Sequence, residues 1–166
     1  MNLTKASALA EIISSVAILI TLLYLVVETR QNTVAIQGTI RQAMLAEDRE
    51  LLLKRIDYPV LSIETRGVAG LTEDEKVQVS NWLIAFTRTR ENHWLQYQNG
   101  VIDEATWRSY LTPYVNTMSM ESSRAWWRVR VARRAYDQGF IDYIDGILAE
   151  IPIRPVQSIS EDTGFE

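Results

Sequence analysis

The chain contains no cysteine and a single histidine, His93. The absence of cysteine excludes disulfides, thiolate catalysis and cysteine-ligated zinc or iron–sulfur clusters. One imidazole is too few for a histidine-based metal cluster within the chain, and the spacing in Glu91-Asn92-His93 differs from the Glu-x-x-His motif of di-iron bundles. We therefore expect His93 to be a core or domain-surface residue, and we expect no cofactor.

Sequence motifs of the common enzyme classes are also missing. The 166 residues hold no glycine-rich phosphate loop and no serine-hydrolase, zincin or kinase signature. Asp142 and Asp145 are a carboxylate pair, but their i, i+3 spacing is typical of a solvated helix face. The balance of 17 basic and 21 acidic residues, net charge -4, gives no field that favours nucleic acid. The sequence predicts a non-enzymatic protein that binds no nucleic acid.

Proline is absent between Ser7 and Ile56, and Gly38 is the one glycine there. A helix of up to roughly 50 residues, about 75 Å long, fits this stretch. Its residues Ile12 to Val27 carry no charge, and extension back to Ser7 gives 21 residues, enough to cross a hydrocarbon core of roughly 30 Å. We predict one transmembrane helix, with Glu11 near one interface.

A cleaved signal peptide and a buried helix of a soluble fold both fit this apolar segment less well. A signal peptide needs a small-x-small cleavage site after its apolar run, whereas this run leads directly into Glu28, Thr29 and Arg30. A buried helix of a soluble fold normally has a polar face, whereas the only polar residues of this one are Ser14, Ser15 and Thr21.

Basic residues flank the segment unequally. Lys5 and the α-amino group precede it, whereas the basic residues after it include Arg30, Arg41, Lys54 and Arg55. The positive-inside rule then favours a cytoplasmic location for the soluble domain.

Small and polar residues recur along the long helix with alternating spacings of three and four, which is a heptad pattern. This helix-association seam comprises Ser7, Ala10, Ser14, Ala17, Thr21, Tyr24, Glu28, Gln31, Ala35, Gly38 and Gln42. Small residues let membrane helices approach closely, and polar ones form interhelical hydrogen bonds. The seam favours self-association or docking onto another membrane protein; the alternative is that its small residues face lipid by chance and its polar residues are simply solvated.

The rest of the chain predicts a small all-α soluble domain, because no segment alternates with period two for long enough to form a strand. The predicted organisation is a transmembrane and juxtamembrane helix over 1–57, a helical domain over 58–153 and a flexible acidic tail over 154–166. Pro59 ends the long helix, and a short helix is expected over Val60 to Arg66.

Four further helices follow from capping and breaking residues. Thr72 and Glu75 form a capping box for a helix that ends at Gly100. Roughly one face of this helix carries Val79, Leu83, Phe86, His93 and Tyr97, with Trp82 and Trp94 beside it. Asp103 caps the next helix, which Pro113 interrupts or bends. A third is expected from Ala125 to Tyr136, capped by Ser122 or Ser123, and Gly139 separates it from a last amphipathic helix closed by Pro152 and Pro155.

An arginine-rich segment runs from Arg124 to Arg134. Its candidate lipid-contact residues are Trp127, Arg124, Arg128, Arg130 and Arg134, and each basic residue near an anionic surface contributes about 1 kcal/mol. The alternative is that Trp126, Val129 and Ala132 pack inward while the arginines pair with acidic residues of other helices.

Several short motifs occur in a specific order along the chain. They are Leu23-Tyr24-Leu25, Arg30-Gln31-Asn32-Thr33, Glu91-Asn92, Gln96-Tyr97, Gly100, Asp103-Glu104, Trp107 and Arg124-Ala125-Trp126-Trp127. In this combination the chain, to about residue 150, resembles a widespread family of small bacterial membrane-anchored proteins. The resemblance implies a bacterial inner-membrane protein with one span and a C-terminal helical domain, and it implies no activity and no catalytic residues.

These observations together predict a membrane-anchored, non-enzymatic helical protein. Its expected partners are membrane lipid and, through the long N-terminal helix, a protein: a second copy in a homo-oligomeric scaffold, or a larger membrane complex of which it is an accessory subunit. The alternative function is a peripheral sensor that binds anionic lipid.

Overall fold

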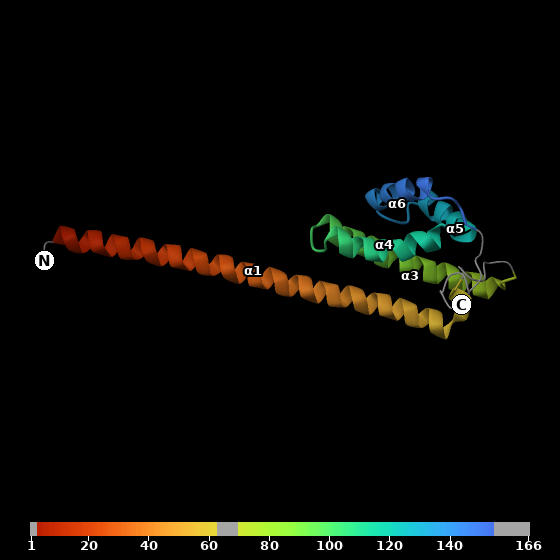
Figure 1. The fold of residues 1–166 in the computed structure, drawn as a ribbon, viewed down its shortest axis with the longest axis horizontal. Coiled ribbons are helices and arrows are strands. Elements are labelled where there is room, and N and C mark those ends of the chain that lie inside the picture. Colours follow the sequence, from red (N-terminus) through yellow and green to blue (C-terminus); the bar gives the residue numbers. More distant parts are fainter. Residues whose placement is uncertain (1–2, 63–69, 155–166) are drawn as a thin grey trace. The chain divides into compact units, whose positions relative to one another are not determined.

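The computed structural model describes residues 3–62 and 70–154 of the chain (Figure 1). Within these ranges the secondary structure is helical and contains no strand, apart from one isolated bridge between Met120 and Arg154. The elements are α1 (Leu3–Asp57), the 3-10 helix η1 (Pro59–Leu61), α3 (Glu73–Gln98), α4 (Glu104–Met118), α5 (Glu121–Ala132) and α6 (Gln138–Glu150). The predicted all-α fold, a long apolar N-terminal helix followed by a helical domain, is confirmed.

α1 is a single helix of 55 residues that ends directly before Tyr58 and Pro59, as predicted. It is long and apolar enough to cross a membrane, and its apolar window is wholly exposed. The hydroxyls of Ser15 and Thr21 donate to the carbonyl oxygens of the residues four positions earlier, at 2.8 and 2.9 Å. These bonds satisfy polar groups that would be costly to leave unpaired in an apolar surrounding.

The chain divides into two compact units, Met1–Gln42 and Ala43–Glu166. The division lies inside α1, about four turns before its end. The second unit therefore contains residues 43–57 of α1 together with the helices that follow, whereas the predicted boundary at residue 57 follows the end of the helix.

The ends of α3 and the start of α4 are set by the predicted local signals. The Thr72 hydroxyl accepts from the Glu75 backbone N–H at 3.3 Å, and the Thr72 N–H donates to the Glu75 carboxylate at 2.8 Å, which completes the capping box. Gly100 has φ +69°, a conformation that glycine adopts without strain. Asp103 then caps α4 by accepting from the Thr106 N–H at 2.7 Å.

Of the two alternatives predicted for Pro113, interruption of the helix is wrong, because α4 is continuous through this residue. Two further predictions about the later helices are also wrong. α5 begins at Glu121 rather than Ala125, and its N-cap residue, Met120, makes no side-chain cap. Gly139 lies inside α6, whose cap is Asp137.

Two predictions fall partly outside the described residues. Of the expected helix over Val60 to Arg66, the described part is the short 3-10 helix Pro59–Leu61. The expected acidic tail lies almost entirely beyond residue 154.

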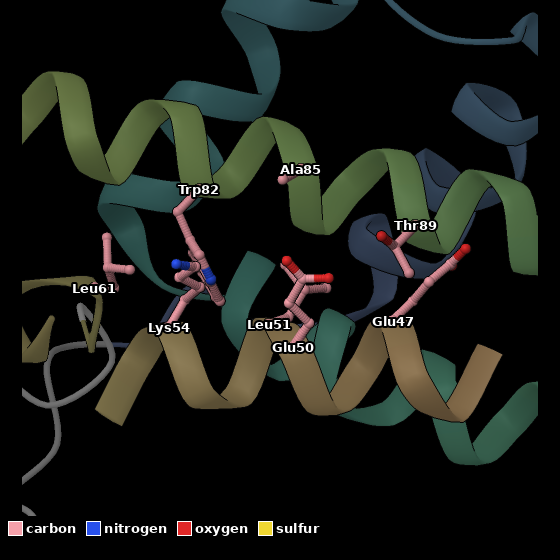
Figure 2. Close-up of a pocket in the computed structure, with 8 residues that line it drawn as sticks. All are labelled: Glu47, Glu50, Leu51, Lys54, Leu61, Trp82, Ala85 and Thr89. Carbon is pink, nitrogen blue, oxygen red and sulfur yellow. The ribbon is translucent and has the colours of Figure 1, made fainter. Parts of the chain in front are cut away.

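The core of the second unit is a continuous set of aromatic side chains from α3, α4, α5 and α6. Trp82 stacks on Phe86 at 5.0 Å between ring centroids, and Phe86 contacts Tyr114 at 5.4 Å. Tyr114 meets Phe140 at 6.3 Å, and Phe140 meets the edge of Trp127 at the same distance. Because Trp82 also lies beside α1, these rings join the end of the long helix to the rest of the domain (Figure 2).

Candidate functional site

Residues 43–57 of α1 present two different faces within the second unit. The inner face is buried or half-buried and consists of Met44, Asp48, Leu51 and Arg55. The outer face is exposed and consists of Leu45, Arg49, Leu52, Leu53 and Ile56. Both sets have helical spacing, so the inner face is the one that α1 uses to contact the domain.

A buried arginine joins the inner face to α3. Arg90 donates to the Asp48 carboxylate at 2.5 Å and to Nδ1 of His93 at 2.9 Å. Its guanidinium also lies over the rings of Phe86 and Tyr110, at 4.8 and 5.4 Å. We refer to Asp48, Arg90 and His93 as the Arg90 cluster. A guanidinium in this position requires its carboxylate, because a buried charge without a partner is strongly destabilising.

His93 is fully buried and belongs to the core. Burial, and secondarily the positive charge of Arg90, lowers the pKa of its imidazole to about 3. The ring is therefore neutral at pH 7. Because Nδ1 accepts from Arg90, the proton is assigned to Nε2, which lies 3.6 Å from the Glu47 carboxylate and makes no hydrogen bond among the described residues.

Two grooves of about 420 Å³ lie on either side of the contact between the inner face and α3. The first, shown in Figure 2, is lined by Glu47, Glu50, Leu51, Lys54, Leu61, Trp82, Ala85 and Thr89. The second is lined by Leu45, Asp48, Arg49, Leu51, Leu52, Arg55, Trp82, Phe86, Arg90 and Pro113. Leu51 and Trp82 line both grooves and so separate them. The indole N–H of Trp82 is buried and has no hydrogen-bond partner among the described residues.

The linings of these grooves are suited to contact with apolar groups. Apolar side chains form most of each floor, and charged residues such as Glu50 and Lys54 stand at the rim. Within the ranges 11–62 and 70–154, no three His, Cys, Asp or Glu side chains are placed to hold a metal ion.

The predicted seam residues from Ser14 to Gly38 lie on α1 in the first unit, where their side chains are exposed. Ala10 belongs to α1, but its side chain lies outside the described ones. Continuing the seam's alternating spacing past Gln42 leads to Leu45, Arg49, Leu52 and Ile56. Sequence reasoning missed these outer-face residues because they are larger and more apolar than the seam, although their spacing continues the same pattern.

Two of the candidate lipid-contact residues are structural. Arg124 is buried and donates to the carbonyl oxygens of Met118, Leu148 and Ile151 at 3.1, 2.8 and 3.4 Å. Burial, and secondarily the nearby Arg128, lowers the pKa of its guanidinium. Trp127 is 1% exposed, and its indole N–H donates to the Asp145 carboxylate at 2.7 Å. Neither side chain is accessible to a lipid headgroup in this fold.

The remaining arginines of this segment differ in exposure. Arg128 and Arg134 are exposed, whereas Arg130 is half-buried, donates to the Ser80 hydroxyl at 2.9 Å and lies over the Trp126 ring. Of the three residues in the alternative orientation, Trp126 is half-buried and donates to the Ser80 hydroxyl at 3.1 Å, whereas the prediction for Val129 and Ala132 is wrong. Val129 is 50% exposed and Ala132 is exposed, because Trp127, on a different side of α5, is the residue that packs into the core.

The structural role of Arg124 gives a first testable prediction. Arg124→Met removes three charge-assisted hydrogen bonds to carbonyl groups at the ends of α4 and α6. We expect the free energy of unfolding of the full chain in detergent to fall by about 3 kcal/mol. The control Arg128→Met, at an exposed position of α5, should change it by no more than about 0.5 kcal/mol. Equal effects of the two variants would contradict the structural assignment.

A second prediction concerns the pH dependence of stability. The pKa of His93 is about 3 when folded and about 6.5 when unfolded. Between these values the unfolded chain binds a proton that the folded chain does not, so stability is lost as the pH falls through this window. The His93 contribution is at most about 1.4 kcal/mol per pH unit.

His93→Gln retains an oxygen that accepts from Arg90 and removes the titration. Chemical denaturation at a series of pH values from 4 to 7 should therefore show a steeper acid loss in the wild type than in the variant. Parallel curves for the two proteins would mean that His93 does not titrate with a lowered pKa.

Comparison with known proteins adds no assignment to this site. No family model, no curated protein and no solved structure matches the chain. Its function is therefore inferred from its own sequence and geometry.

Proposed function

We propose that this is a membrane-anchored, non-enzymatic helical protein that assembles with other membrane helices through α1. It acts either as a homo-oligomeric scaffold or as an accessory subunit of a larger membrane complex. The observation that carries the proposal is the exposure of the whole apolar window of α1, an uninterrupted helix of 55 residues. In water such a surface would cost roughly 25 cal/mol for each Å² of apolar area, whereas lipid accommodates it.

Assembly is supported by the kinds of residue on the seam. Apolar side chains gain little from contacting each other rather than lipid, so membrane helices associate by close packing and hydrogen bonding. Ser14 and Ala17 permit close approach, and Gln31 offers an interhelical hydrogen bond just beyond the apolar run. All three positions are exposed on α1.

A structural rather than a chemical role is supported by the use of the buried polar groups. Arg90 and His93 bind each other, and Arg90 also binds Asp48. The buried Glu91 carboxylate accepts from Arg88 at 2.6 Å and from the Asp137 N–H at 2.5 Å. Each of these groups is held in contacts that join elements of the domain.

The lipid-sensor alternative has less support. Two of its five candidate residues, Arg124 and Trp127, make buried contacts with α4 and α6 and are not available to a headgroup. Arg128 and Arg134 remain exposed, which leaves a smaller basic surface than the sequence suggests.

We further propose that the span lies in a bacterial inner membrane, as the resemblance implies, and that the helical domain is cytoplasmic, since basic residues are more numerous after the span than before it. The absence of cysteine makes this testable with one introduced thiol. Asn99→Cys, at the exposed end of α3, should react with a membrane-impermeant maleimide only after the cells are lysed. Labelling in intact spheroplasts would place the domain on the opposite side.

The assembly proposal is tested by changing bulk on and off the seam. Ser14→Leu with Ala17→Leu keeps the span insertable but holds neighbouring helices apart. Leu19→Ala with Leu22→Ala is the matched control on the opposite side of the helix, where bulk should matter little. Native electrophoresis of mildly solubilised source membranes should show a complex larger than the monomer in the wild type and the control, and its loss in the first variant.

Two results of this experiment would contradict the proposal. Migration of the wild-type protein only as a monomer would contradict the assembly proposal. If both double variants assemble like the wild type, the small residues face lipid and the seam does not mediate association.

A further inference from the structure

The outer face of α1 is an apolar surface in residues 43–57, which follow the predicted transmembrane segment. Leu45 is 61% exposed, Leu52 57%, Leu53 46% and Ile56 64%. Their spacing of i, i+7, i+8 and i+11 is the pattern of a helix face that packs against another element. Within the described residues, no element of this chain covers them.

This face extends into the second groove. Leu45, Leu52 and Arg49 belong to both, and the groove adds the buried rings of Trp82 and Phe86 and the edge of Pro113. The result is a continuous surface formed by one row of leucines on α1 and an aromatic floor on α3. A row of apolar residues from a second helix fits such a shape, in the way that amphipathic helices bind in hydrophobic grooves.

The charge on the outer face restricts the partner. Arg49 stands in the middle of the leucine row, is exposed, and pairs with no carboxylate among the described residues. Arg55, at the groove's edge, lies over the Trp82 ring at 5.5 Å. A partner helix that covers these leucines has one side chain opposite Arg49. If that side chain is a carboxylate, it forms a charge-assisted hydrogen bond with the Arg49 guanidinium.

A second copy of this chain is a poor occupant. Copies inserted in one membrane with the same topology are parallel, and in a parallel coiled coil each heptad position faces itself. Arg49 would then face Arg49 of the other copy. Like charges placed together act against a partner, which is how interfaces reject wrong pairings.

We propose that the outer face and the second groove bind a helix of a different membrane-anchored protein, one with an apolar face and an acidic residue opposite Arg49. This inference rests on the proposed function, because it names the partner of an assembly that α1 mediates. The seam register drifts by about 20° per heptad on a straight helix, so the bound helix follows α1 with a left-handed twist.

The test uses the full chain in nanodiscs of zwitterionic lipid and two synthetic probes. The probes are fluorescent amphipathic helical peptides that are identical except at the centre of the apolar face, where one has Glu and the other Lys. Fluorescence anisotropy, corrected for binding to empty nanodiscs, gives the two dissociation constants. We expect the acidic peptide to bind the wild type at least about tenfold more tightly than the basic one.

Three variants assign the binding to the proposed surface. Arg49→Glu should reverse the preference, and Leu52→Asp should abolish binding of both peptides. Arg128→Glu, which makes the same charge change at an exposed position of α5, should leave the preference unchanged. Failure of both peptides to bind, or an acidic preference that survives Arg49→Glu, would overturn the inference.

The mass of the protein in detergent without peptide, measured by sedimentation, separates this inference from the proposed function. We expect Leu52→Asp to have the same mass as the wild type, because no second copy occupies the outer face. A wild-type dimer that Leu52→Asp dissociates would show that a second copy occupies the outer face, which overturns the inference but supports assembly through α1. If the peptides bind as expected while the Ser14 and Ala17 double variant still assembles, the result supports the proposed binding surface and contradicts association through the seam.

Discussion

The placement of the end of the long helix in the second unit depends on one buried guanidinium. Arg90 on α3 is enclosed by the rings of Phe86 and Tyr110, and the carboxylate that compensates its charge comes from Asp48 on α1. Charge–ring contacts of this kind contribute about 0.5–2 kcal/mol, but they do not replace an anion. Removing the carboxylate would leave a buried charge unpaired, which costs about 3–5 kcal/mol. The end of α1 is therefore held to α3 at a defined rotation.

That rotation determines which residues of α1 remain outside. With Asp48 directed at Arg90, Met44 and Leu51 also turn toward the domain. Leu45, Leu52 and Ile56 are each one position further along the helix than an inner-face residue, about 100° around it, and so remain exposed. The exposed leucine row is thus on a different face of α1 from the one that carries the buried ion pair.

Much of the fold could be predicted from the sequence because its signals are local. The length of α1 follows from the absence of proline, and the starts of α3 and α4 follow from Thr72 and Asp103. α5 was misplaced because its local signals are ambiguous. Trp126 and Trp127 are adjacent and chemically equal, and the choice between them is made by Asp145 and Phe140, which lie on α6 and accept from or pack against Trp127 alone. No pattern within α5 contains that information.

The candidate site shows a similar limit. The arginines from Arg124 to Arg134 resemble a basic surface in sequence, yet Arg124 is buried against three carbonyl oxygens and Arg130 binds a hydroxyl. The charge of an arginine does not reveal whether its side chain is exposed. A guanidinium has five N–H donors, so it binds the carbonyl groups at helix ends as readily as it binds a phosphate. The spacing of the outer face, by contrast, was readable, but whether Leu45 and Leu52 lie inside or outside depends on the Asp48–Arg90 pair.

Anchoring alters what the outer face needs to contribute in the proposed assembly. Two proteins confined to one membrane meet at a high effective concentration, so a second contact adds to association without having to supply all of it. A short row of leucines beside a groove is then large enough to add to the association. Under these conditions affinity comes largely from the membrane helices, and the charge at Arg49 contributes mainly selectivity, because like charges are rejected more strongly than opposite charges are rewarded.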